Sequence, residues 1–195
     1  MMPTDESLML AVRNGEVDQF AVLFERHHDR LFAFFYRMTG DPPASEDLAQ
    51  EVFVRMLKYR SGFGETSEFR AWMYQIARNV RADHFRKRMA EAELPEDARA
   101  DEGRLASVHL ERQEELSVLQ QALLALSEDK REILILARFE EMKYEAIAAM
   151  LEIEVGAVKV RVHRALRELR AVYLRLSGEE PKCDVKKPKT ILRTT

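Results

Sequence analysis

Apolar residues recur at three- and four-residue intervals along most of this chain, the spacing that places them on one face of an α-helix. The stretch from Phe20 to Met38 is the clearest example, with Phe and Leu on one stripe and charged residues between them. No run alternates apolar and polar residues between turn signals, as a half-buried strand would. The pattern therefore predicts an all-α protein.

Turn and capping signals divide the first ninety residues into four predicted helices. The first spans about Glu6 to Asn14 and stops at Gly15, and the second is long and ends at Gly40. The third follows the turn "DPPASED", and the fourth begins near Glu68 after the loop "SGFGETS". We interpret residues 1–90 as one small helical domain.

The apolar pattern fades after Arg88 and returns in a second set of helices. The intervening segment, residues 91–112, carries seven acids against three bases and is predicted to be a linker. Residues 113–177 form the second predicted domain, and residues 178–195 have little to bury and are predicted to be a disordered tail. The helices of the second domain are expected at about Glu114–Leu126, Glu128–Phe139, Tyr144–Leu151 and Val155 to about Leu176.

The last two predicted helices, in "YEAIAAMLEIEVGAVKVRVHRALREL", are joined by a turn of a few residues, which is typical of a helix-turn-helix. From residue 155 to residue 177 the second carries six bases against one acid, which favours DNA over the alternative of a solvated cationic face. Gly156 leaves backbone N–H groups open to a phosphate. The first turns would face base edges and the later ones phosphates; the expected contact residues are Gly156, Ala157, Lys159, Val160, Arg161, His163, Arg164 and Arg167.

Composition narrows the remaining possibilities. The net charge of −3 alone argues against a nucleic-acid binder, but the bases are concentrated in two helices on either side of the acidic linker. One cysteine, Cys183, excludes an internal disulfide, and no His or Cys cluster has metal-ligand spacing, so no metal or cofactor is expected. No secretory signal or stretch of ~20 apolar residues occurs. We expect a soluble cytoplasmic protein without membrane insertion.

The fourth helix, "FRAWMYQIARNVRADHFRKR", is the second basic helix, and it places rings and cations outside its apolar stripe. This mixture suits single-stranded nucleic acid, because rings stack on bases and cations hold the backbone. In the loop before it, Phe63, Thr66 and Ser67 have two interpretations. They could form a pocket for an extruded base, or Phe63 could belong to the core while Ser67 caps the helix. Local chemistry alone favours the second.

Four segments in this order and at these separations resemble the extracytoplasmic-function (ECF) sigma factors of bacterial RNA polymerase. They are "EDLAQEVFVRM", "FRAWMYQIARNVRADHFRKR", "LSEDKREILIL" and the helix-turn-helix quoted above. The resemblance covers about Glu6 to Leu176. It implies that the first domain docks on core RNA polymerase and opens the minus-ten element of promoter DNA, while the second domain reads the minus-thirty-five element.

The resemblance also assigns residues to these roles. It implies a flipped-base pocket in the loop from Phe63 to Phe69, so Phe63, Thr66 and Ser67 join the minus-ten set, and it makes an anti-sigma protein a hypothetical partner. Glu152 and Glu154 depart from the small residues common in the family, and Glu154 becomes a candidate acceptor for a cytosine amine. The implied polymerase-docking residues are Asp47, Leu48, Gln50, Glu51 and Phe53, and the further minus-ten residues are Asn79, Asp83, Arg86, Lys87 and Arg88.

Two other classes of protein remain as alternatives. A helix-turn-helix regulator that binds operator DNA would share the second domain but would need no polymerase-docking surface. A helical enzyme using His27 and His28 is less well supported, because neighbouring residues point to different sides of a helix and no paired carboxylates accompany them. No catalytic residue is therefore assigned.

Overall fold

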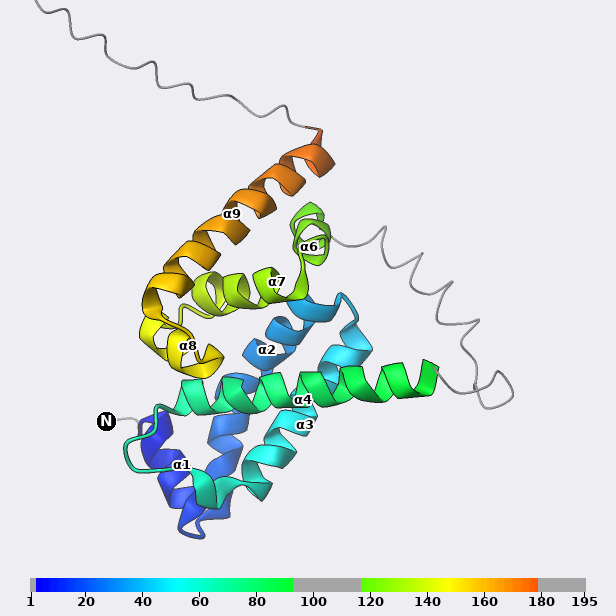
Figure 1. The fold of residues 1–195 in the computed structure, drawn as a ribbon. Coiled ribbons are helices and arrows are strands. Elements are labelled where there is room, and N and C mark those ends of the chain that lie inside the picture. Colours follow the sequence, from blue (N-terminus) through cyan, green and yellow to red (C-terminus); the bar gives the residue numbers. More distant parts are fainter. Residues whose placement is uncertain (1–2, 93–116, 179–195) are drawn as a thin grey trace, which may run out of the picture.

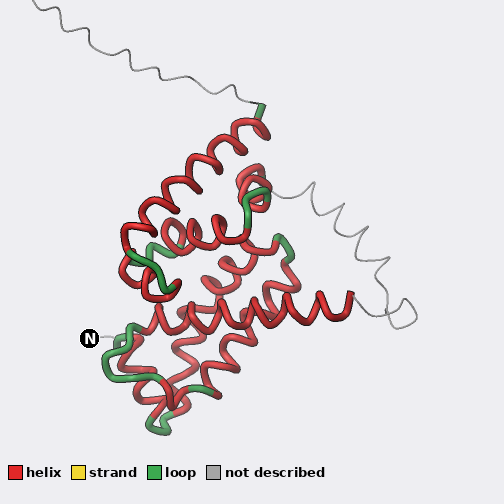
Figure 2. The backbone as a smooth tube through the Cα atoms, in the orientation of Figure 1, coloured by secondary structure: helices red, strands yellow, loops and turns green. Residues whose placement is uncertain are grey.

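The computed structural model describes residues 3–92 and 117–178, and every regular element in these two ranges is a helix. The prediction of an all-α protein is thus confirmed, and the short connections between helices are visible in Figure 2. Most of the expected linker and tail lies outside the described residues. Within the two ranges, no helix combines the length and apolar composition that crossing a membrane requires.

Four α-helices build the first domain around a core of Phe, Leu and Met side chains. The turn of Asp41 starts α3 as the sequence indicates, since its side chain accepts from the backbone N–H of Ala44 at 3.3 Å. Gly40 ends α2 with a left-handed φ of 72°. The helices are α1 (Asp5–Arg13), α2 (Phe20–Thr39), α3 (Pro42–Lys58) and α4 (Phe69–Ala92).

One helix of the second domain is less regular than its sequence pattern predicts. The segment expected as one helix over Glu128–Phe139 changes to a π-helix at Ile135–Phe139. A single π turn is invisible to a 3.6-residue pattern. The helices of this domain are α6 (Val118–Leu124), α7 (Glu128–Leu134), α8 (Tyr144–Leu151) and α9 (Val155–Ser177).

The two domains pack against each other, with α8 of the second domain lying against α4 of the first (Figure 1). Further contacts join α2 to α6 and α7. The sequence pattern predicts two domains on a linker and contains no sign of this contact.

Three large apolar residues of the helices are exposed although the helical repeat of apolar residues would place them on an inner face. Phe24, Leu119 and Leu166 have exposed fractions of 39%, 39% and 42%. Leu166 shows the reason: the inner face of α9 packs through Val158, Val162, Ala165 and Leu169, and Leu166 falls beside that face.

Candidate nucleic-acid interface

Helix α9 presents its cations to solvent as predicted. Its apolar face packs on α6, α7 and α8, and most side chains on its other side are exposed in the part of the chain that the structure describes. Ala157 is half-buried at the edge of this surface. The exposed members of the predicted set are Glu154, Gly156, Lys159, Val160, Arg161, His163, Arg164 and Arg167.

Glu152 and Glu154 lie in the turn between α8 and α9, where smaller residues were expected. Glu152 ends α8 with a φ of 54°, a left-handed conformation that glycine adopts more easily. Glu154 stands at the N-cap of α9 but makes no side-chain capping hydrogen bond, which Ser or Thr would supply. Both residues keep the helix-turn-helix geometry without the stabilisation that the usual small residues give.

The predicted polymerase-docking set splits into surface and core. Asp47 and Gln50 are exposed on α3 and Glu51 is half-buried, whereas Leu48 and Phe53 are each only 4% exposed. The ring of Phe53 lies at 5.9 Å from that of Phe20. Leu48 and Phe53 therefore support the α3 surface from the core, and assigning them as contact residues is corrected.

Arg55 joins the α3 surface to α4. Its guanidinium donates to Glu51 at 2.7 Å and to Asp83 at 2.6 Å, and Asp83 also pairs with Arg86. The hydrogen bonds from Arg55 and Arg86 lower the pKa of Asp83. Asp83 thus positions two cations at the surface, beside the exposed side chains of Asn79, Lys87 and Arg88.

The loop before α4 places Phe63 in the core, as local chemistry favoured, but it does not use Ser67 as a helix cap. Phe63 is 1% exposed and its ring packs edge-on against Trp72, with centroids 5.2 Å apart, so it offers no face to an extruded base. Ser67 does not cap α4, because its hydroxyl accepts from Gly64 at 3.1 Å. The backbone N–H of Phe69 is instead bound by Glu6 of α1. Thr66 is the exposed member of the predicted set.

Four residues of α4 that the sequence suggested for nucleic acid instead face the second domain. Tyr74 is fully buried and its hydroxyl donates to Glu140, while burial and the Glu140 carboxylate raise its pKa. The others are Arg70, Arg78 and Arg81, each bonded to a residue of the second domain.

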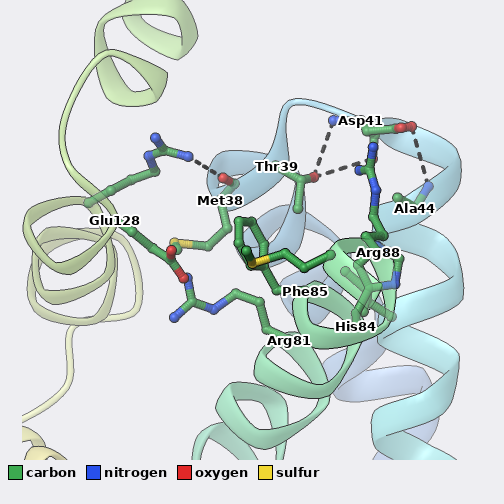
Figure 3. A pocket seen from close by; sticks show the side chains of 12 residues that line it. Met38, Thr39, Asp41, Ala44, Arg81, His84, Phe85, Arg88 and Glu128 are labelled. Carbon is green, nitrogen blue, oxygen red and sulfur yellow. Dashed lines mark hydrogen bonds and ion pairs between the residues drawn. The ribbon is translucent and has the colours of Figure 1, made fainter. Parts of the chain in front are cut away.

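One surface on the same helix was not predicted from the sequence. Phe85 and Met89 are each 55% exposed and line a pocket between the domains, together with His84, Arg88 and the α2–α3 turn (Figure 3). In the sequence, the only sign of this surface is that Phe85 and Met89 are apolar residues outside the expected apolar stripe of α4.

Comparison with known proteins defines the class first. Residues 23–91 match the model of Sigma-70 region 2, and residues 116–169 match that of Sigma-70 region 4. The first range covers α2 to α4 with their surface cations, and the second covers the helix-turn-helix up to residue 169. Both parts of a sigma factor are therefore present in one chain.

The particular family follows from whole-chain relatives. The ECF RNA polymerase sigma factor SigW of Bacillus subtilis is 31% identical over 82% of this chain and 91% of its own length. The sigma factor RpoE of Bartonella quintana, solved with the anti-sigma factor NepR, is 25% identical with a TM-score of 0.63, over 78% of this chain and 95% of its own. CnrH, solved with the cytosolic domain of CnrY, shares the fold at 23% identity and a TM-score of 0.67, over 90% and 99% of the two chains.

The chain belongs to the ECF RNA polymerase sigma factors, and it directs RNA polymerase to promoters. The sigma factor interpretation is thereby confirmed over that of an operator-binding regulator. The histidines of the enzyme alternative have structural partners: His27 bonds Asp5 and His28 bonds Glu46.

Proposed function

We propose that the first domain docks on core RNA polymerase through the exposed polar face of α3. Asp47, Gln50 and Glu51 supply carboxylate and amide groups there, and the buried Leu48 and Phe53 hold the helix in place. Acidic and amide groups over a rigid apolar support suit a partly polar protein interface. On this basis the first domain spans residues 1–90 and the acidic linker follows it.

The minus-ten element is proposed to lie along the outer side of α4. Arg86, Lys87 and Arg88 are exposed in one turn there, and Asn79 lies about two turns earlier on the helix. Thr66 and Ser67 of the preceding loop remain in the proposed surface, with Asp83 as the residue that holds Arg86. Phe63 is left out because its ring is enclosed in the core.

The minus-thirty-five element is proposed to bind the exposed side of α9. Lys159 and Arg161 stand in the first two turns, from which a helix in the major groove reaches base edges. Arg164 and Arg167 follow where phosphates would lie. Glu154 is exposed at the helix start and can accept from a cytosine amine.

We propose that the chain acts in the cytoplasm, without catalytic activity, and that an anti-sigma protein binds it. Their support is membership of the ECF family and the likeness to RpoE, which was solved with the anti-sigma factor NepR.

The observation that carries the promoter assignment is the continuous exposed cationic side of α9. We would mix the purified chain with core RNA polymerase and map transcript starts from a pool of genomic promoters. Discrete starts that share upstream elements are expected.

Two variants separate base contacts from phosphate contacts, by transcript mapping and by promoter binding of the polymerase complex at several salt concentrations. Lys159→Ala should change the preferred base at one upstream position, at about 1–3 kcal/mol of discrimination. Arg164→Ala should weaken all promoters and reduce the salt slope of binding by about one. Transcripts without shared elements, or identical effects of both variants, would refute these assignments.

A further inference from the structure

Two buried carboxylates of the second domain are satisfied by the first. Glu132 and Glu140 are 4% and 2% exposed. Among the described residues, every side chain that bonds either carboxylate comes from α2 or α4. A carboxylate is rarely buried without partners, so this burial depends on contact between the domains.

Glu140 is the more enclosed of the two. It follows the π-helix directly, and its backbone N–H donates to the carbonyl of Ile135 at 3.0 Å. Tyr74 donates its hydroxyl to the carboxylate, and Arg70 binds both the carboxylate and the backbone carbonyl. Two arginines of α2 complete the cluster, with atoms at 3.5 and 3.8 Å from Glu140: Arg30 and Arg37.

Glu132 binds the next turns of α4. Arg78 and Arg81 donate to the same carboxylate oxygen at 3.0 and 3.1 Å. Arg78 also donates to the carbonyl of Met150, at the end of α8, at 2.9 Å. In the opposite direction, Arg131 donates to the carbonyl of Met38 (Figure 3), and the Gln120 amide donates to that of Tyr36 at 2.7 Å.

The proposed function requires these domains to separate. The minus-ten and minus-thirty-five elements lie about 25 base pairs apart, or about 85 Å along the duplex at ~3.4 Å per base pair. In the structure, Arg78 of α4 touches Met150 of the helix-turn-helix. With both domains in contact, α4 and α9 cannot reach two elements at that separation.

We propose that Glu132 and Glu140 form an intramolecular latch that holds the free sigma factor closed by occupying the arginines of α4 and α2. The proposal rests on the proposed function for the need to open, and on the contacts alone for the closed form. Simultaneous binding of both promoter elements requires the open form, so binding to polymerase and DNA competes with the latch through the equilibrium between the closed and open forms.

The interface has the character of a reversible contact. Besides apolar packing, it contains ion pairs and hydrogen bonds between α4 and the second domain, the polar component found in transient interfaces. Within the described part of the chain, the buried Nε atoms of Arg70 and Arg81 have no hydrogen-bond partner. Water would satisfy both after opening, which lowers the cost of release.

The test compares the full-length chain with the double variant Glu132→Gln and Glu140→Gln. Neutral amides keep the volume but remove the charges that the arginines pair with, so only the closed form loses interactions. The matched control is Glu168→Gln, which removes one ion pair, with Lys130, inside the second domain. Small-angle X-ray scattering of the free proteins reports domain separation, and titration with core RNA polymerase reports affinity.

We expect wild type and control to be compact and the double variant to show a larger radius of gyration. Its polymerase affinity should rise at least about threefold, since the apparent dissociation constant is divided by the fraction of open molecules. A double variant as compact as wild type, with equal affinity, would overturn the latch.

If circular dichroism shows the double variant unfolded, scattering from the wild type decides, and an extended wild type would overturn the latch. Failure of every protein to bind polymerase would instead overturn the proposed function, while the scattering profiles would still decide the latch.

Discussion

His27 and His28 are neighbours in α2 whose environments shift their pKa values in opposite directions. His27 is 4% exposed, and burial lowers its pKa despite its bond to Asp5. Burial also acts to lower the pKa of His28, but hydrogen bonds with Glu46 and Asp29 outweigh it, so that pKa is raised. The fold therefore favours the charged form of His28 and disfavours the charged form of His27.

These shifts predict opposite pH trends in the free energy of unfolding. The His28 contribution is fully present below its unfolded pKa near 6.5 and is lost as pH rises through its higher folded pKa. The substitution His28→Gln should therefore lower the free energy of unfolding more at pH 5 than at pH 8, by about 0.5 kcal/mol. Urea unfolding at several pH values measures it.

His27→Gln is the matched comparison, because protonation of the buried ring opposes folding as pH falls through 6.5. Its cost relative to wild type should shrink at pH 5. If both variants lost stability with the same dependence on pH, the opposite pKa shifts of His27 and His28 would be contradicted.

The turn between α8 and α9 shows how an element can keep its geometry with an unfavourable residue. Glu152 holds a left-handed φ of 54°, so Glu152→Gly should raise the free energy of unfolding by about 1 kcal/mol. The control Glu145→Gly, inside α8, should lower it by about 1 kcal/mol. Thermal unfolding of both variants provides the measurement. No gain at residue 152 would mean that its side chain contributes to the turn.

Helix positions could be predicted where caps and periodicity agree. Gly40 and Asp41 place the α2–α3 junction, and the expected bounds of α8 match the structure. The π turn before Glu140 could not be predicted, because it lies at the end of the helix and no further apolar repeat follows in which a shift of the pattern would show. Phe63 was misassigned because an aromatic residue between glycines has the same sequence signature in a core and in a pocket.

At the scale of the molecule, the contact between domains was not predictable from the sequence. Arg78 and Glu132 are 54 residues apart, and Arg70 and Glu140 are 70 apart. Each arginine lies outside the apolar stripe of α4, as a DNA-facing cation also would. Only the folded structure shows that each arginine pairs with a carboxylate of the second domain.

The closed molecule should be less stable without the Tyr74 hydroxyl. Tyr74→Phe keeps the ring among its neighbours but removes the donor to the buried Glu140 carboxylate. Loss of a buried hydrogen bond to a charged group should lower the free energy of unfolding by about 1–3 kcal/mol. Chemical denaturation measures this, and Tyr173→Phe, at a partly exposed ring of α9, should stay within about 0.5 kcal/mol of wild type.

The pairing of Glu132 and Glu140 with arginines also bears on where the protein spends its time in a cell. A genome offers millions of non-specific sites that retain exposed cations through phosphate contacts. Carboxylates that occupy those arginines act as an internal substitute for phosphate, so the free chain is retained less by bulk DNA. A closed molecule would then search for polymerase by free diffusion and acquire its full DNA affinity only after assembly.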